Sequence, residues 1–359
     1  MDILNIDGVK IAGVVACLPE NLYDTNIECG SLFSEEQMKT VIKATGISKK
    51  SIVSKGTTSL DLCVLAAKNL LENTGTNSQE IGAVICVTFT PEYLMPSDAP
   101  AAQSRLNIPN NSLAFDINMA CSGYGYGLFV AATIVKSLNK KVLLLDGDIQ
   151  STYLSRLDKS TVPVLADGGS ATLLTPTDNS TRWNFSFFTD GSKRDVLKIP
   201  SGGTKNPFKQ TDMNYIEYED GSKRRNIDIY MDGFSIFKFV AQEASRFIAN
   251  FMDENELNSD VLDAFIPHQA NMYMISQLGK KLKFKEFQIW KSGDKFGNPS
   301  SSSIPLTIAY NANEWFSNGK GSKVLLSGFG GGLSISVAAI DLPKDSFYNV
   351  ITKKEGQSE

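Results

Sequence analysis

Cys121 is the residue whose surroundings most favour nucleophilic chemistry. It lies in residues 119–123 (MACSG), between an apolar run of strand length and an apolar stretch of helix length. A thiol at the N-terminus of a helix feels the positive end of the helix dipole, which lowers its pKa and favours the thiolate. The sequence therefore predicts a reactive thiol at Cys121. Cys63 and Cys86 lie on apolar faces and are expected to be buried and structural.

Three further segments carry polar groups that suit acyl chemistry. His268 is the one histidine and so the one imidazole available for acid–base work near neutral pH. Considered alone, His268 is expected to be a structural residue. Asn298, in a Gly-Asn-Pro context, is expected to be a turn residue. The glycine run around Gly331 can present backbone N–H groups to an oxyanion. A single histidine without a nearby cysteine cluster makes no zinc site of the usual kind, so we expect no metal.

The elements that position these residues follow from apolar periodicity. Strand-length apolar runs alternate with amphipathic helix-length stretches, which predicts an α/β fold with buried sheets. We expect a helix over residues 59–73 and strands over 83–89, 141–145 and 323–326. The two KVLL runs are 323 − 141 = 182 residues apart, and the similar segments around them predict two related halves.

Two segments lie outside this pattern. Residues 190–230 are rich in charge, glycine, asparagine and proline, and read as an irregular insertion with one hairpin. The polar end of the chain, residues 344–359, is expected to be a surface tail.

Composition excludes several classes of protein. The net charge of −4 argues against a broad nucleic-acid-binding surface. The chain has no apolar run of about 18 residues, so we expect no membrane span. The N-terminus has no basic leader of the kind a signal peptide needs. The five cysteines form no CxxC pair, which is typical of free thiols in a reducing compartment, so we expect a cytoplasmic protein.

Taken together, the segments resemble the β-ketoacyl-acyl carrier protein synthase III family of the thiolase superfamily. The matches follow the family's order: TGI (45–47), MPS (95–97), DINMACSGYGYGL (116–128), ADGGSATLL (166–174), MDGFSIFKF (231–239), IPHQAN (266–271), GNPSSSSIP (297–305) and SGFGGGLS (327–334). The resemblance implies a thiolase-like layered αβαβα fold of two pseudo-duplicated halves. Residues 1–176 would carry the cysteine, residues 177–343 the histidine and asparagine, and two copies would form a homodimer.

The resemblance also implies a reaction. Cys121 would accept the acyl group of a primer, carried by coenzyme A or acyl carrier protein, while the backbone N–H groups of Cys121 and Gly331 hold the oxyanion. His268 and Asn298 would donate hydrogen bonds to malonyl-carrier protein as carbon dioxide leaves. The product would be a β-ketoacyl thioester for fatty acid or specialised acyl-group biosynthesis. Acyl carrier protein would be a partner, and no cofactor would be permanently bound.

Departures from the family pattern concern the substrate. Thr40 and Ala44 stand where the family usually has a Trp and an Arg that hold the nucleotide of coenzyme A. We therefore hypothesise that the acyl donor arrives on a carrier protein more readily than on coenzyme A. The basic run at 280–285 either meets an acidic carrier or is a solvated helix face. The substrate-binding residues expected from the alignment of motifs are Met95, Phe234, Lys238, Asn271 and Tyr273.

Other functions remain open from the residues. An acyltransferase or thioester hydrolase on the same fold would use the acyl-cysteine without decarboxylation, so dependence on malonyl thioester separates it from a condensing enzyme. Cys121 and His268 are 268 − 121 = 147 residues apart, within the spacing of papain-like hydrolases, but the local signature of those enzymes is missing. An inactive carrier-binding subunit would have no chemical reason to keep the cysteine, histidine and asparagine together.

Overall fold

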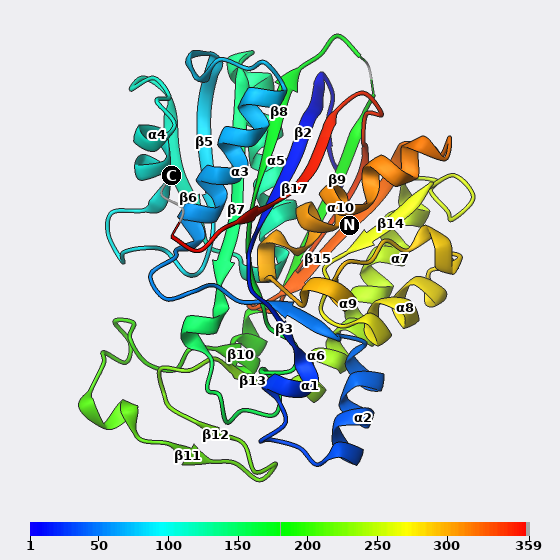
Figure 1. The fold of residues 1–359 in the computed structure, drawn as a ribbon. Coiled ribbons are helices and arrows are strands. Elements are labelled where there is room, and N and C mark those ends of the chain that lie inside the picture. Colours follow the sequence, from blue (N-terminus) through cyan, green and yellow to red (C-terminus); the bar gives the residue numbers. More distant parts are fainter. Residues whose placement is uncertain (180, 357–359) are drawn as a thin grey trace.

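Two mixed β-sheets form the centre of the protein. A computed structural model describes residues 1–179 and 181–356. The sheets lie side by side, with helices between them and on both outer faces (Figure 1). This arrangement confirms the predicted thiolase-like layered αβαβα fold.

The first sheet has six strands in the order β17-β2-β8-β7-β5-β6. The strands β5, β6 and β7 run parallel, whereas β8 runs antiparallel to both β7 and β2. The predicted strand at 83–89 is β5, which begins and ends two residues earlier, at Ile81 and Val87. The bounds are β2 (Val9–Pro19), β5 (Ile81–Val87), β6 (Leu113–Ile117), β7 (Lys141–Ile149), β8 (Asp167–Pro176) and β17 (Phe347–Lys353).

The second sheet has five strands in the order β1-β9-β16-β15-β14. The strand β15 is parallel to β14 and antiparallel to β16. The bounds are β1 (Leu4–Ile6), β9 (Trp183–Thr189), β14 (Ala264–Pro267), β15 (Lys323–Gly330) and β16 (Ser334–Asp341). The two ends of the chain each pair with the other sheet: β1, near the N-terminus, belongs to the second sheet, and β17, near the C-terminus, belongs to the first. The division into halves at residues 176 and 177 therefore stays a prediction.

Helices complete the layers. The helices α5 (Gly123–Leu138) and α10 (Ser303–Ser317) bury their apolar side chains between the two sheets. The helices α3 (Ser59–Asn73) and α4 (Asp98–Arg105) cover the outer face of the first sheet. The helices α7 (Ser245–Glu254) and α8 (Met272–Lys281) cover the outer face of the second. The predicted helix over 59–73 is confirmed as α3, which begins at a Thr58 capping box.

The segment 190–230 is an irregular insertion, as predicted. It contains one hairpin, formed by β11 (Ile216–Glu217) and β12 (Lys223–Arg224), and the short pair β10 (Leu197–Lys198) and β13 (Tyr230–Met231). It lies at the end of the sheets where β7 and β15 end (Figure 1).

Other elements lie outside the two sheets and the layers that cover them. They are β3 (Leu22–Asp24), β4 (Lys49–Ser51), α1 (Thr25–Glu28), α2 (Glu35–Thr45), α6 (Gly233–Phe239) and α9 (Gly293–Phe296).

The expectation of a polar surface tail at 344–359 is wrong for the residues that form β17. This strand pairs in parallel with β2 along the edge of the first sheet. Tyr348 is only 3% exposed, and its carbonyl accepts a hydrogen bond from Asn313 on α10. The edge of β2 offers unpaired backbone groups, and the alternating apolar side chains of the tail fit the adjacent surface.

Candidate active site

Cys121 lies in a tight turn between β6 and α5. A single 3-10 turn, Ala120–Ser122, leads from the strand into the helix, and Ala120 adopts a left-handed backbone conformation with φ 45°. The end of β15 presses against this turn. A Cβ atom on Gly330 would lie 2.9 Å from Cys121 Cβ and 3.0 Å from its backbone nitrogen. The turn therefore needs a residue without a side chain at position 330.

His268 follows β14 and is almost completely buried. Its Nδ1 atom lies 2.7 Å from the hydroxyl oxygen of Ser303, the first residue of α10. Its backbone N–H donates to the carbonyl of Ser327 on β15, and its ring meets the ring of Phe329 edge-on, with 5.5 Å between centroids. Burial lowers the pKa of His268 to about 3, with a backbone hydrogen bond to Ser300 acting in the opposite direction. The imidazole is therefore neutral.

Asn298 lies in the loop between α9 and α10 and is 5% exposed. Its side-chain Oδ1 accepts a hydrogen bond of 3.0 Å from the backbone N–H of Ser300. Its backbone carbonyl accepts from Gln150 Nε2 at 2.7 Å and from the backbone N–H of Ala166 at 2.9 Å. The bond to Oδ1 orients the side-chain amide and leaves its Nδ2 group as the donor end.

Ser300 joins the three residues. Its Oγ lies 3.5 Å from Cys121 Sγ, its backbone N–H bonds Asn298, and a backbone hydrogen bond links it to His268. The structure thus brings together Cys121, His268 and Asn298, which we call the Cys–His–Asn cluster. The motif GNPSSSSIP (297–305) predicted a role for Asn298 and none for its serines. The signal that was available is the unbroken run of four serines next to Asn298.

The expectation of a lowered thiol pKa is wrong in this structure. Burial raises the pKa of Cys121 to about 12, whereas the hydrogen bond from Ser300 lowers it and the charge of Asp148 raises it further. Removal from water penalises the thiolate more than the dipole of one helix terminus favours it. Cys63 and Cys86 are buried as expected, and burial raises the pKa of both thiols well above the usual value.

Among the described residues, those expected to bind substrate form no hydrogen bond with the Cys–His–Asn cluster. Phe234 and Lys238 are exposed on α6, and Tyr273 is exposed on α8. Asn271 caps α8, where its Oδ1 accepts from the backbone N–H of Met274 at 2.6 Å. Met95 is 86% exposed. Gly331 directly follows the glycine that packs against Cys121.

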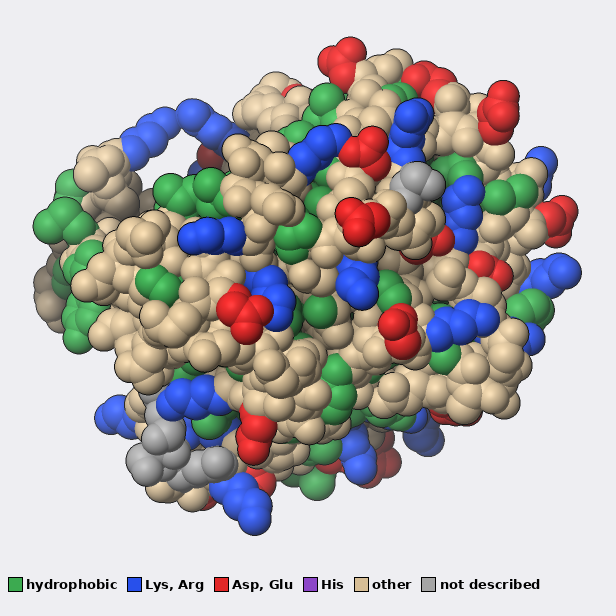
Figure 2. All heavy atoms as spheres, turned by 90° about the horizontal axis from the view of Figure 1, so that it is seen from above, with side chains coloured by type: hydrophobic (Ala, Val, Ile, Leu, Met, Phe, Trp, Pro, Cys, Tyr) green, Lys and Arg blue, Asp and Glu red, His purple; other side chains and the backbone are tan. Residues whose placement is uncertain are grey.

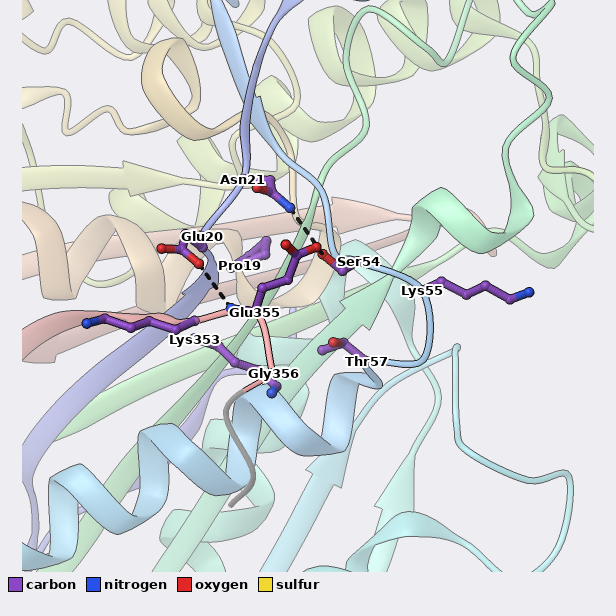
Figure 3. Close-up of a pocket in the computed structure, with 10 residues that line it drawn as sticks. Pro19, Glu20, Asn21, Ser54, Lys55, Thr57, Lys353, Glu355 and Gly356 are labelled. Atoms are coloured by element: carbon purple, nitrogen blue, oxygen red, sulfur yellow. Dashed lines mark hydrogen bonds between the residues drawn. The ribbon is translucent and has the colours of Figure 1, made fainter.

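A pocket of about 200 Å³ lies elsewhere, between the end of β17 and the loop at 54–57 (Figure 3). Glu355 reaches over Ser54 and accepts its hydroxyl hydrogen bond, and Asn21 donates to the same hydroxyl. None of the lining residues belongs to the Cys–His–Asn cluster. The backbone N–H of Glu355 donates to the carboxylate of Glu20 at 3.0 Å across the same pocket.

Metal-binding and membrane-spanning features are absent from the part of the chain that the structure describes. Residues 1–179 and 181–356 contain no group of three histidine, cysteine or acidic side chains arranged to hold a metal ion. Within the same residues, no helix combines the length and apolar character that crossing a membrane requires. Figure 2 shows acidic and basic side chains intermingled on one face.

Comparisons with known proteins agree with one another. Residues 115–191 match the family model for 3-oxoacyl-acyl-carrier-protein synthase III, and residues 252–342 match the model for its C-terminal part. The β-ketoacyl-acyl-carrier-protein synthase III of Campylobacter curvus is 30% identical over 346 residues, covering 95% of this chain and 99% of that one. The corresponding protein of Aliarcobacter butzleri is 31% identical over 301 residues, covering 82% and 86%. The crystal structure of a 3-oxoacyl-acyl-carrier-protein synthase from Burkholderia xenovorans superposes with a TM-score of 0.91 at 29% identity, covering 98% of this chain and 99% of that one.

Proposed function

This chain belongs to the β-ketoacyl-acyl carrier protein synthase III family, the condensing acyltransferases of fatty acid biosynthesis, and we propose that its Cys–His–Asn cluster catalyses the reaction. Cys121 is the nucleophile, and His268 and Asn298 are hydrogen-bond donors. The observation that carries this proposal is the convergence of all three residues on Ser300.

In the first step Cys121 takes the acyl group of the primer. Its sulfur attacks the thioester carbonyl, the bond from carbon to the donor's sulfur breaks, and the donor leaves as a thiol. The backbone N–H groups of Cys121 and Gly331 stabilise the oxyanion. The support for this assignment is the close packing of Gly330 against Cys121, which holds the glycine loop beside the sulfur.

In the second step malonyl-carrier protein loses carbon dioxide. The bond from the α-carbon to the carboxylate breaks, and its electron pair forms an enolate whose oxygen needs hydrogen-bond donors. We assign the Ser303 hydroxyl as the donor to His268 Nδ1, 2.7 Å away, while its oxygen accepts from the backbone nitrogen of Gln269 at 3.4 Å. Nε2 of His268 then carries the proton and donates, as does Nδ2 of Asn298. The enolate carbon attacks the acyl-cysteine, and Cys121 leaves as a thiolate.

The acyl chain of the primer has an apolar cluster beside Asn298. Leu165 forms a backbone bridge with Asn298 and packs with Leu154 and Ile229, and Phe89 and Leu197 join this group. We propose these apolar side chains as contacts of the primer's acyl chain.

This chain accepts its acyl group from an acyl-carrier protein more readily than from acyl-coenzyme A. Thr40 donates its hydroxyl hydrogen bond back to Glu36 on its own helix, and Ala44 offers neither charge nor ring. Neither residue replaces the nucleotide contacts that a Trp and an Arg make. Tight binding of acyl-coenzyme A, followed by efficient acylation of Cys121, would contradict this preference.

The functional unit is a homodimer. Leu94 and Met95 are 95% and 86% exposed, and Leu113 on the edge strand β6 is 48% exposed. Exposed apolar groups at an open sheet edge favour an interface. A molar mass of one chain by light scattering at micromolar concentration would contradict the dimer. The five free cysteines support a reducing, cytoplasmic environment.

The test of the reaction is intact-protein mass spectrometry. The protein and its Cys121→Ala variant are incubated with acyl-coenzyme A and acyl-carrier thioesters of increasing chain length, and then with malonyl-carrier protein. We expect an acyl adduct on the protein alone, discharged by malonyl-carrier protein with release of a β-ketoacyl thioester. Discharge by water, an alcohol or an amine would instead identify a thioester hydrolase or an acyltransferase.

A further inference from the structure

The thiol of Cys121 has no base in direct contact. Among the described residues, the hydrogen-bond partner of its sulfur is the hydroxyl of Ser300 at 3.5 Å. No hydrogen bond joins the imidazole of His268 to the sulfur among these residues, and its Nδ1 lies 2.7 Å from the hydroxyl oxygen of Ser303. The proton that Cys121 loses when it attacks a thioester therefore needs another route.

Ser300 is held in place by its backbone. It adopts the left-handed conformation, φ 52°, which a serine rarely occupies. The bond from its N–H to Asn298 Oδ1 stabilises this turn and directs the hydroxyl toward the sulfur. Backbone strain of this kind persists where the surrounding structure fixes it, and it is common at functional sites.

Asp148 fixes the same turn from the other side. Its Oδ2 accepts from the hydroxyl of Ser301 at 3.0 Å and from the Ser301 backbone N–H at 3.4 Å. Its Oδ1 accepts from the N–H of Phe89 at 2.9 Å and from the Thr88 hydroxyl at 3.1 Å. Burial raises the pKa of Asp148, and hydrogen bonds from the Phe89 backbone and from the side chains of Ser300 and Ser301 lower it.

On the premise that Cys121 is the nucleophile, we propose that Ser300 is a further catalytic residue, whose hydroxyl receives the thiol proton and passes its own proton to the departing sulfur. The bond from Cys121 sulfur to the acyl carbon forms as the S–H bond breaks. The bond from that carbon to the donor's sulfur breaks, and this sulfur takes the proton of the Ser300 hydroxyl. Ser300 ends as it began, and the products are the acyl-cysteine and a free thiol. Asp148 is a positioning residue that acts through the turn.

The arrangement also predicts a bond to the thiolate. When Cys121 is ionised, the Ser300 hydroxyl donates to it, and a hydrogen bond to a charged group is stronger than one between neutral groups. Among the described residues, the titratable groups that face the sulfur and this hydroxyl are Asp148 on β7 and His268 after β14. Both side chains are kept when Ser300 is substituted, but Asp148 loses the hydrogen bond from the Ser300 hydroxyl that lowers its pKa.

The experiment measures the rate at which iodoacetamide alkylates Cys121 as a function of pH, by intact mass. The variants are Ser300→Ala and Ser300→Gly, and glycine tolerates the left-handed backbone. Ser302→Ala is the matched control, because its hydroxyl bonds the carbonyl of Pro299 instead of the sulfur. We expect both Ser300 variants to slow alkylation of Cys121 by about tenfold at each pH and to slow acylation by about tenfold. The control should match the unmodified protein.

Two results would overturn the proposal. One is an unchanged alkylation profile in both Ser300 variants. The other is normal behaviour of Ser300→Gly beside a slow Ser300→Ala, since the effect would then come from the backbone turn. Alkylation requires no thioester, so the proposed function is tested separately. Slower alkylation of the Ser300 variants, in a protein that no thioester acylates, would support the Ser300–Cys121 bond and contradict the proposed function.

Discussion

The imidazole of His268 is joined to the hydroxyl of Ser303 by a hydrogen bond of 2.7 Å. In the proposed mechanism the Ser303 hydroxyl donates to Nδ1 and accepts from the backbone N–H of Gln269, so Nε2 carries the proton that the enolate needs. The first residue of α10 thus sets the tautomer of a residue at the end of β14.

Substitution of Ser303 by alanine should therefore impair condensation more than acylation. We expect Ser303→Ala to lower the rate of malonyl decarboxylation by about tenfold to a hundredfold, because the imidazole loses the bond that orients it. Acylation of Cys121 should change little. The measurement is single-turnover kinetics of each step, with Ser303→Thr as the control that keeps a hydroxyl. Equal losses in both steps would contradict this role for Ser303.

The neutral state of His268 predicts how stability depends on pH. Burial lowers its pKa to about 3, against an ordinary value of 6.5. Between these values the unfolded chain binds a proton that the folded chain does not. The contribution of His268 therefore destabilises the fold progressively as the pH falls from about 6.5 toward 3, and it is constant above that window.

The measurement for this prediction is urea denaturation of the protein and of His268→Gln at about pH 5 and about pH 8. The difference in unfolding free energy between the two proteins should change by up to about 1.4 kcal/mol per pH unit inside the window. Burial raises the pKa of aspartates such as Asp148, so their contribution to stability changes with pH in the opposite direction. Comparison of the protein with His268→Gln cancels that contribution. A difference that stays constant with pH would mean that His268 is not held neutral.

The sequence predicted those features that depend on local pattern. Apolar periodicity located the α3 helix at its observed bounds, and the motifs located the three residues that meet at Ser300. The roles of Ser300 and Ser303 could not be read from the run of serines, because they depend on distances to residues far away in sequence. The pKa of Cys121 was predicted in the wrong direction, since the helix dipole is local whereas burial is tertiary. The strand β17 was missed because its partner, β2, lies at the other end of the chain.

Gly330 should be intolerant of any side chain. A Cβ atom there would lie within 3.0 Å of the Cys121 backbone nitrogen, and the atoms that it meets cannot rotate away. We expect Gly330→Ala to lose about 1–3 kcal/mol of stability and to abolish acylation of Cys121. Gly203→Ala is the control, because nothing lies within 4 Å of its added carbon. Thermal melts and adduct formation by mass spectrometry are the measurements, and normal acylation of Gly330→Ala would refute the close packing.

Tyr348 should anchor β17 to the layered core. Its ring is buried against the helix between the sheets, and its hydroxyl donates to the carbonyl of Pro343 at 2.8 Å. We expect Tyr348→Ala to lower the unfolding free energy by about 3 kcal/mol, because a large cavity forms. Tyr348→Phe keeps the ring and should lose only about 1 kcal/mol. Chemical denaturation measures both, and equal values would show that the ring contributes nothing beyond its hydroxyl.

Arg224 should hold the insertion to the rest of the molecule. Its guanidinium is buried, bonds Asp158 at 2.8 Å and packs 4.5 Å from the ring of Tyr218. Removal of Arg224 leaves the carboxylate of Asp158 buried without its partner, which costs about 3 kcal/mol. We expect Arg224→Ala to accelerate cleavage by chymotrypsin within the insertion.

The matched control for this prediction is Lys223→Ala, because Lys223 precedes Arg224 in the same hairpin strand and its ion pair with Glu217 is exposed. Peptide mapping of timed digests locates the cuts, and the melting temperature reports on the layered core. Equal cleavage rates in the two variants would mean that the buried ion pair does not fix the insertion. Cleavage spread evenly over the chain, with early cuts in α5 and α10, would show that the insertion and the core unfold together.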